Sequence, residues 1–370
     1  MSFLLAPRRV DLNLWTYTFE PGTHGGALVN GGRLAAALLP ETAIASMADA
    51  ARFRELLSEK AGRPARAEDE LWIFETDRVV ATQEASEGRG SGAAAAAAWL
   101  AGMVRADGSV VFSADARTGA GRLTGDLHHA RVATALRALG RQGDFGECVA
   151  IARRRLAADM RAALAGRDVA GWPKERDRIA GTLALASLAG ARVDAALEEA
   201  ASWPELESSP WHAAQVVLAL GERAPPSLWA SCVRALGKRP WAPWTALAAH
   251  GRGEAEVYAR CLPPLVASVR AEAPYEGGVS EGASSGVPEI ALTAIVVEAL
   301  VGARSLAARV AVRRARAFLV RWQCLPACAP GLIDLRTAYG AFPASPVHPL
   351  LRVDVTAHAC MALNSHRVGW

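Results

Sequence analysis

The stretch GDLHHARVATALRALG at residues 125–140 decides the fold. From Ala130 onward Ala, Val and Leu recur at the spacing of one helix face and Gly140 ends the run, which predicts a helix over 126–140. A second apolar-periodic stretch follows at 144–165, so the two helices form a predicted pair. The first of them opens with Asp126, His128 and His129, ahead of its apolar face.

The same arrangement recurs to the end of the chain. Further pairs are predicted at 174–189 with 192–202, 210–221 with 226–236, 241–250 with 254–271, and 287–302 with 305–322, before a last helix at 353–365. Most first helices begin with polar or aromatic residues, which a plain helical stack does not need. We therefore predict a mainly α fold, an (α/α)6 toroid over 91–370 whose last helix packs against 43–59 or 93–104. An open superhelix is the alternative.

Residues 1–90 differ from the rest and predict a small α/β N-terminal elaboration. The alternating, aromatic-rich run at 10–19 predicts a strand, and 20–26 has the composition of a turn. Residues 43–60 have a helical apolar period, while 71–82 predict a hairpin that turns at Thr76-Asp77. This segment would pack on the helical body or serve association with a protein partner or a second copy.

Composition restricts the class of protein. The chain has 370 residues, is 51% hydrophobic and carries a formal net charge of +4, which suits a packed globular protein and gives no support to a nucleic-acid partner. The basic run at 309–321 has apolar residues at helical spacing and indicates a solvated outer helix face, with anion or nucleic-acid binding as the alternative. We find no targeting segment, no membrane span and no extracellular cysteine framework, so we expect a cytoplasmic protein. Richness in Ala, Arg and Gly suggests a GC-rich, bacterial genome.

Two stretches carry a resemblance to a known superfamily. They are 108–115 followed by 126–136, and RVDVTAHACMAL at 352–363. The chain resembles the α/α-toroid superfamily, which includes N-acylglucosamine 2-epimerase-like enzymes, several glycosidases, and terpenoid cyclase and protein prenyltransferase β-subunits. The second stretch is similar to the closing Asp…His helix of prenyltransferase β-subunits, whose His is a zinc ligand. The Asp-x-Cys pair, the Asp-x-Asp-Asp signature and the Gln-Trp repeats of those families are absent, so the resemblance implies the superfamily alone.

Histidines and carboxylates at helix starts are the catalytic candidates. At most one of His128 and His129 faces a central cavity, and Asp126 is either a cap or part of the site. Asp354 and His358 are four residues apart and share a helix face, as a buried pair or as an acid–base couple. Glu281 lies in a Gly-rich loop and is a candidate general acid. Glu289 is a second candidate, or a carboxylate that simply favours the start of the next helix.

The candidate substrate-binding residues are aromatic or cationic: Trp211, His212, Trp241, Arg176 and Arg352. Trp stacks on sugar rings but is also a large core residue, so both interpretations stay open. Cys324 and Cys328, with His358 and Cys360, raise the alternative of a zinc site, at a spacing wider than usual.

The sequence thus predicts an enzyme of isomerase, hydrolase or lyase type. It would act on a carbohydrate or another polar small molecule by His/carboxylate acid–base chemistry, without a cofactor. The alternatives are a zinc-assisted toroid that modifies terpenoids or peptides, and a non-catalytic helical scaffold or partner subunit.

Overall fold

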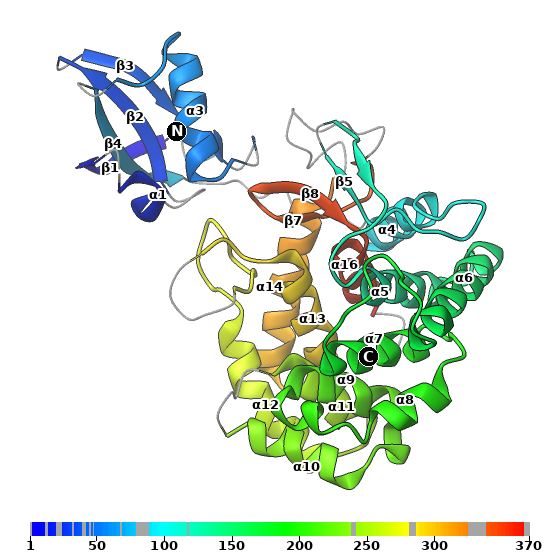
Figure 1. Cartoon of the computed structure of the whole chain (residues 1–370). Coiled ribbons are helices and arrows are strands. Elements are labelled where there is room, and N and C mark those ends of the chain that lie inside the picture. The colour runs from blue at the N-terminus through cyan, green and yellow to red at the C-terminus, as the bar shows by residue number, and fades with distance from the viewer. Residues whose placement is uncertain are drawn as a thin grey trace.

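A computed structural model describes residues 2–11, 14–19, 24–31, 33–38, 42–43, 46, 48–66, 69–78, 89–116, 118–237, 242–280, 286–324 and 338–365. Over these residues the protein is mainly helical, with a strand-containing N-terminal part (Figure 1). Within the described residues, none of the helices combines the length and the apolar character that crossing a membrane requires.

The N-terminal part is an antiparallel sheet with a helix on it (Figure 1). Its strand order is β1 (Ser2–Val10), β4 (Glu70–Arg78), β2 (His24–Asn30) and β3 (Arg33–Leu38). Helix α3 (Ala50–Lys60) contacts β2 and β3, and the Asp49 side chain caps it by accepting from the Arg52 backbone N–H. This part has its own core, built around Trp15, Phe53 and Leu57.

Three N-terminal predictions were wrong. The run 10–19 contains the short helix α1 (Trp15–Thr18). One helical turn brings Trp15 and Phe19 together, and their rings stack with centroids 4.6 Å apart. The predicted turn at 20–26 overlaps β2, which begins at His24. The predicted hairpin at 71–82 does not turn at Thr76-Asp77, since both residues continue the pairing of β4 with β1, and residues 79–82 lie outside the described residues. The helix predicted over 43–60 is confirmed from Ala50.

The predicted helical pairs are present. Each pair consists of two contacting helices: α5 (His128–Gly140) and α6 (Gly146–Leu164), α7 (Arg176–Leu188) and α8 (Asp194–Ala200), α9 (Pro210–Leu220) and α10 (Pro226–Ala235), α11 (Pro243–Gly251) and α12 (Ala255–Ser268), and α13 (Ile290–Leu300) and α14 (Leu306–Trp322). The last helix, α16 (Val353–Asn364), packs against α4 (Arg89–Gly102), which was one of its two predicted partners.

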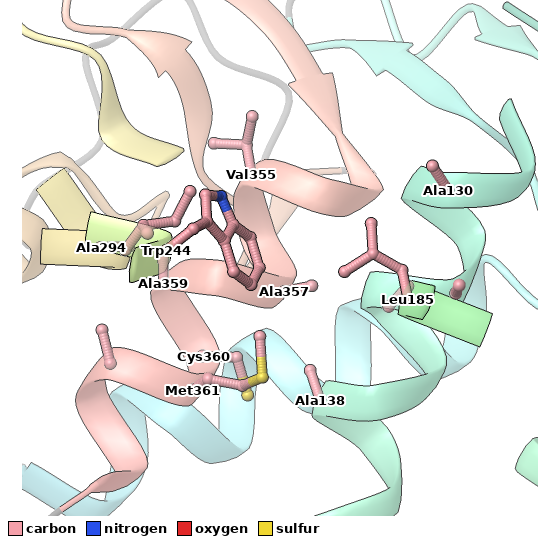
Figure 2. Close-up of a cluster of buried hydrophobic side chains, with 14 of the residues drawn as sticks. Ala130, Ala138, Leu185, Trp244, Ala294, Val355, Ala357, Ala359, Cys360 and Met361 are labelled. Carbon is pink, nitrogen blue, oxygen red and sulfur yellow. The ribbon is translucent and has the colours of Figure 1, made fainter. Parts of the chain in front are cut away.

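The first helices of these pairs also contact one another. Helix α5 contacts α7, α7 contacts α9, α9 contacts α11, α11 contacts α13, α13 contacts α16, and α16 contacts α5. We call these six the inner helices. They are buried on most sides and rich in Ala, because small side chains allow several helices to approach closely. Figure 2 shows side chains from five of them in one cluster: Ala130, Leu185, Trp244, Ala294 and Ala357.

A small sheet joins the starts of α5 and α16. Its order is β6 (Gly121–Arg122), β5 (Ser113–Asp115), β8 (His348–Arg352) and β7 (Pro343–Ser345). Strand β8 leads directly into α16, and the Val353 backbone N–H donates to the Phe112 carbonyl over 3.3 Å. The sheet therefore fixes the polar start of α16 beside that of α5.

Candidate active site

The amino-terminal ends of the inner helices lie together. Contacts between their first residues link α7 to α9 (Asp177 with His212), α9 to α11 (Trp211 with Trp244), and α16 to α5 (Asp354 with Arg131). His129 of α5 also contacts Trp172, in the segment before α7. Trp244 also contacts His358 of α16, and Glu289 before α13 interacts electrostatically with Arg352. We call this end of the inner helices the first-turn end.

His212 forms a carboxylate–imidazole pair with Asp177. Its Nδ1 lies 3.1 Å from Asp177 Oδ2 and 2.8 Å from Ser209 Oγ. Burial lowers the pKa of His212, while the Asp177 charge opposes that shift. Burial acts to raise the pKa of Asp177, but hydrogen bonds with Ser209 and the Arg178 backbone, together with His212, bring it below its usual value. Because Nδ1 makes both contacts and no described residue bonds to Nε2, the second nitrogen is free for a ligand.

Gly181 allows this pair to form. It lies on α7 opposite the His212 ring, and a Cβ at this position would stand 2.6 Å from His212 Cδ2. Real Cβ atoms do not approach that closely, so any larger residue would displace the imidazole. The absence of a side chain on α7 therefore decides where the ring of α9 lies.

His358 forms a second pair, with Glu298 of α13. Its Nδ1 lies 2.9 Å from Glu298 Oε1, and both side chains are buried. The carboxylate that orients His358 is thus Glu298 of α13, and not Asp354 on the same helix as His358. As in His212, Nε2 has no hydrogen-bond partner among the described residues. The His358 ring also packs edge-on against Trp244, with centroids 5.9 Å apart.

Asp354 is held by two arginines. Arg352 donates to both of its carboxylate oxygens, over 3.0 and 2.6 Å, and Arg131 Nε lies 3.7 Å from Oδ2. Burial acts to raise the pKa of Asp354, but the hydrogen bond and charge of Arg352 lower it, with help from Arg131. Arg131 in turn lies over the Phe112 ring. The cluster is an ionised anchor at the start of α16, and Arg352 is positioned by Asp354.

His128 and His129 lie at the start of α5, but neither has a carboxylate partner on Nδ1. Both Nδ1 atoms are buried and lack a hydrogen bond. Burial lowers the pKa of His128 to about 4 and lowers that of His129, so both rings are neutral at pH 7. His128 packs against Phe112, and His129 is edge-on to Trp172. Their surroundings are aromatic, unlike those of His212 and His358.

Two tryptophans extend from α9 to the His358 pair. Trp211 and Trp244 meet edge-on with centroids 6.0 Å apart, so a continuous line of rings runs from α9 to His358. Trp211 is 39% exposed, whereas Trp244 is buried and its Nε1 has no hydrogen-bond partner. Trp211 is thus the ring of this line that remains open to a ligand.

Other predicted residues lie elsewhere. Trp241 and Glu281 are outside the described residues. Arg176 is exposed, lies 3.5 Å from Glu205 and covers the Trp203 ring, so its charge is already paired. Glu289 precedes α13 as its N-terminal cap residue.

A metal site finds no further support in the described part of the chain, where no group of three or more His, Cys, Asp or Glu side chains could hold an ion. Burial raises the pKa of both Cys324 and Cys360 to about 12, which disfavours the thiolate that zinc requires. Cys328 lies outside the described residues.

Sequence reasoning missed the two carboxylates that matter most. Asp177 stands in the charged run 174–178, whose alternating charges are typical of a solvated helix start, and Glu298 is the single charge in the apolar stretch IALTAIVVEAL. An isolated carboxylate in a buried helix is itself a signal, because such a charge needs a partner. No protein-family model matches the chain, and no curated protein matches its sequence.

Proposed function

We propose that the five helical pairs, together with α16 and α4, form a closed (α/α)6 toroid and that the protein is an acid–base enzyme. Its substrate would be a polar small molecule, a carbohydrate in the simplest case, bound at the first-turn end. The observation that carries this proposal is the presence of two imidazoles, His212 and His358, each with Nδ1 on a carboxylate. A line of rings also runs from Trp211, the residue before His212, through Trp244 to His358.

The carboxylates give both rings a defined role. A carboxylate that accepts from Nδ1–H fixes the neutral tautomer in which Nε2 carries the lone pair. One Nε2 can then take a proton from the substrate, while the other ring, in its protonated form, donates one. Such a pair of groups supports epimerisation or isomerisation next to a carbonyl, as well as hydrolysis or elimination, because each reaction removes one proton and delivers another.

The remaining residues of the first-turn end suit a polar ring-shaped substrate. Trp211 offers an open aromatic face of the kind that stacks on sugars. Arg352 and Arg131 place fixed cations around Asp354, within reach of hydroxyl or carbonyl oxygens of a ligand. Because one imidazole accepts a proton and the other donates one, the proposed chemistry needs no cofactor.

The test is turnover in deuterated water. The purified protein is incubated with a panel of aldoses, ketoses, N-acetylated sugars and disaccharides, and NMR records deuterium incorporation and new products. We expect one class to react, and we expect His212→Asn and His358→Asn each to reduce the rate at least about 100-fold, the usual contribution of an acid–base group. If no sugar binds or reacts, the proposal is abandoned. Metal analysis of the same sample tests the zinc alternative.

A further inference from the structure

A second group of charges lies behind His358, towards the carboxyl ends of the inner helices. Glu298 is in the last turns of α13, Arg137 is in the last turn of α5, and Arg141 follows α5 as its C-terminal cap residue. Arg141 Nη1 lies 3.9 Å from Glu298 Oε2. His358 therefore makes two kinds of contact. Its Nδ1 bonds to Glu298 of this charged group, and its ring packs against Trp244 of the first-turn end.

Arg137 is unusual in this group. It is 8% exposed, and its Nη1 is buried without a hydrogen-bond partner. An unpaired buried donor costs about 1–3 kcal/mol, so a hydrophobic residue would serve packing alone better at this position. Burial lowers the pKa of Arg137, while the charge of Glu298 opposes that shift. The guanidinium thus carries a buried positive charge that acts on Glu298 through space, whereas Arg141 approaches the same carboxylate directly.

Glu298 depends on these cations. A fully buried carboxyl group tends to take up a proton, because burial disfavours the charged form. Burial acts to raise the pKa of Glu298 in this way, but the hydrogen bond from His358 and the charges of His358, Arg137 and Arg141 bring it below its usual value. The ionised state of Glu298 is therefore maintained by side chains from α16 and α5.

Two other titratable groups on the helices packed against α13 face elsewhere. Arg316 of α14 donates to the Ala362 carbonyl and to Ser365, and His250 of α11 lies beside the Tyr258 ring and Gly302. Cys360 of α16 interacts electrostatically with Glu298 but stays a thiol, since burial raises its pKa to about 12. Its sulfur accepts a hydrogen bond from Gln142.

We propose that Arg137 and Arg141 are positioning residues that keep Glu298 ionised, so that Glu298 accepts Nδ1–H of His358 and leaves the lone pair on Nε2, at the first-turn end. Two arginines that touch no substrate would thereby select the tautomer of a proton-transferring histidine. Only the catalytic consequence rests on the proposed function; the tautomer and the charge of Glu298 are properties of the protein alone.

NMR on the full chain tests the proposal without a substrate. Carboxyl-labelled glutamate reports the titration of Glu298, assigned with Glu298→Gln, and ring ¹⁵N shifts report the tautomer of His358, assigned with His358→Asn. In the wild type we expect the neutral His358 ring to carry its proton on Nδ1. In Arg137→Met we expect the midpoint of Glu298 to rise by about one pH unit or more, a tenfold change in proton affinity.

Arg141 provides the variant that folds most readily, because its side chain is 49% exposed. Arg141→Met should raise the Glu298 midpoint by a smaller amount, since solvent screens an exposed charge, and Arg141→Lys should restore it. Arg153→Met is the matched control: this arginine of α6 also has a buried Nε without a partner. It has no contact with Glu298 among the described residues, so the midpoint should not move.

Two results would overturn the proposal: a Glu298 midpoint that ignores both Arg141→Met and Arg137→Met, or a wild-type His358 ring protonated on Nε2. The outcome is separable from that of the proposed function. If the spectra behave as expected and no sugar is turned over, the enzyme proposal fails and this one stands. If turnover requires His358 while Glu298 ignores the arginines, this proposal alone fails.

Discussion

Glu298 and His358, on neighbouring inner helices, share a 2.9 Å contact between side chains that are 5% and 7% exposed. The contact leaves one nitrogen of the imidazole uncommitted and fixes the other. A similar arrangement recurs at Asp177 and His212, on a different pair of helices. The repeated use of a carboxylate on Nδ1 is the clearest chemical regularity of the protein, and it makes each member of these pairs a target for mutation.

Replacing Glu298 by Gln should destabilise the protein by about 3 kcal/mol, because the substitution leaves the buried Arg137 without its counter-charge. Urea denaturation at pH 7 measures this change in the free energy of unfolding. The control is Glu147→Gln, an exposed glutamate in the first turn of α6. Equal stability of the two variants would show that Glu298 is not a paired buried charge.

Stability should fall between pH 6.5 and about 4 because of His128, whose pKa burial lowers from 6.5 to about 4. In this window His128 is protonated in the unfolded state but neutral in the folded state, so stability rises with pH. Melting temperatures measured across this window should show a shallower slope in His128→Phe. The exposed His348→Asn is the control and should leave the slope unchanged. A wild-type slope in His128→Phe would contradict the prediction.

At pH values below that window, the protonation of Asp354 should determine how stability changes with pH. Its pKa is lowered from 3.8, against the effect of burial, mainly by Arg352. The ion pair therefore contributes stability that is present above pH 3.8 and is lost as pH falls through the lower folded value. In Asp354→Asn the acid limb of the stability curve should be flatter, with lower stability at pH 7. Thermal denaturation between pH 2.5 and 7 checks this, and an unchanged acid limb would refute it.

Gly181→Ala should reduce activity more than it reduces stability. The added Cβ would stand 2.6 Å from His212 Cδ2 and 2.8 Å from Gln215 Oε1, so the imidazole must move away from Asp177. On the proposed function we expect kcat/KM to fall at least about tenfold, as misplacement of an acid–base group does. Gly146→Ala is the control, because that site has open space for a Cβ. Full activity in Gly181→Ala would remove His212 from the mechanism.

Trp211→Ala should weaken substrate binding with little change in stability. Its side chain is 39% exposed, so truncation removes a stacking face and leaves no buried cavity. Calorimetric titration with the sugar found in the screen should show a rise in Kd of about tenfold or more, which is the size of a lost aromatic contact. Trp229→Ala, on the outer helix α10, is the matched control. Equal affinities would place the substrate elsewhere.

The helical part was predictable because its signals are local. The apolar period predicted helices at 126–140 and 353–365, and the structure has them at His128–Gly140 and Val353–Asn364. Gly, Pro and capping residues mark such ends whatever the rest of the chain does. The N-terminal strands were less predictable, since β4 continues through Thr76 and Asp77 only because β1 pairs with it. A strand is defined by its neighbour as much as by its own residues.

The sequence by itself determined the helical pairs, the polar starts of the inner helices and the identity of the histidines, because helix period, capping and residue type are local properties. Only the tertiary structure decided which carboxylate each histidine meets. Asp354 is the carboxylate nearest to His358 along α16, yet Glu298, 60 residues away, bonds to His358. Asp354 instead pairs with Arg352 and Arg131. The partner of a buried side chain is fixed by which helix faces pack together, and no local pattern contains that information.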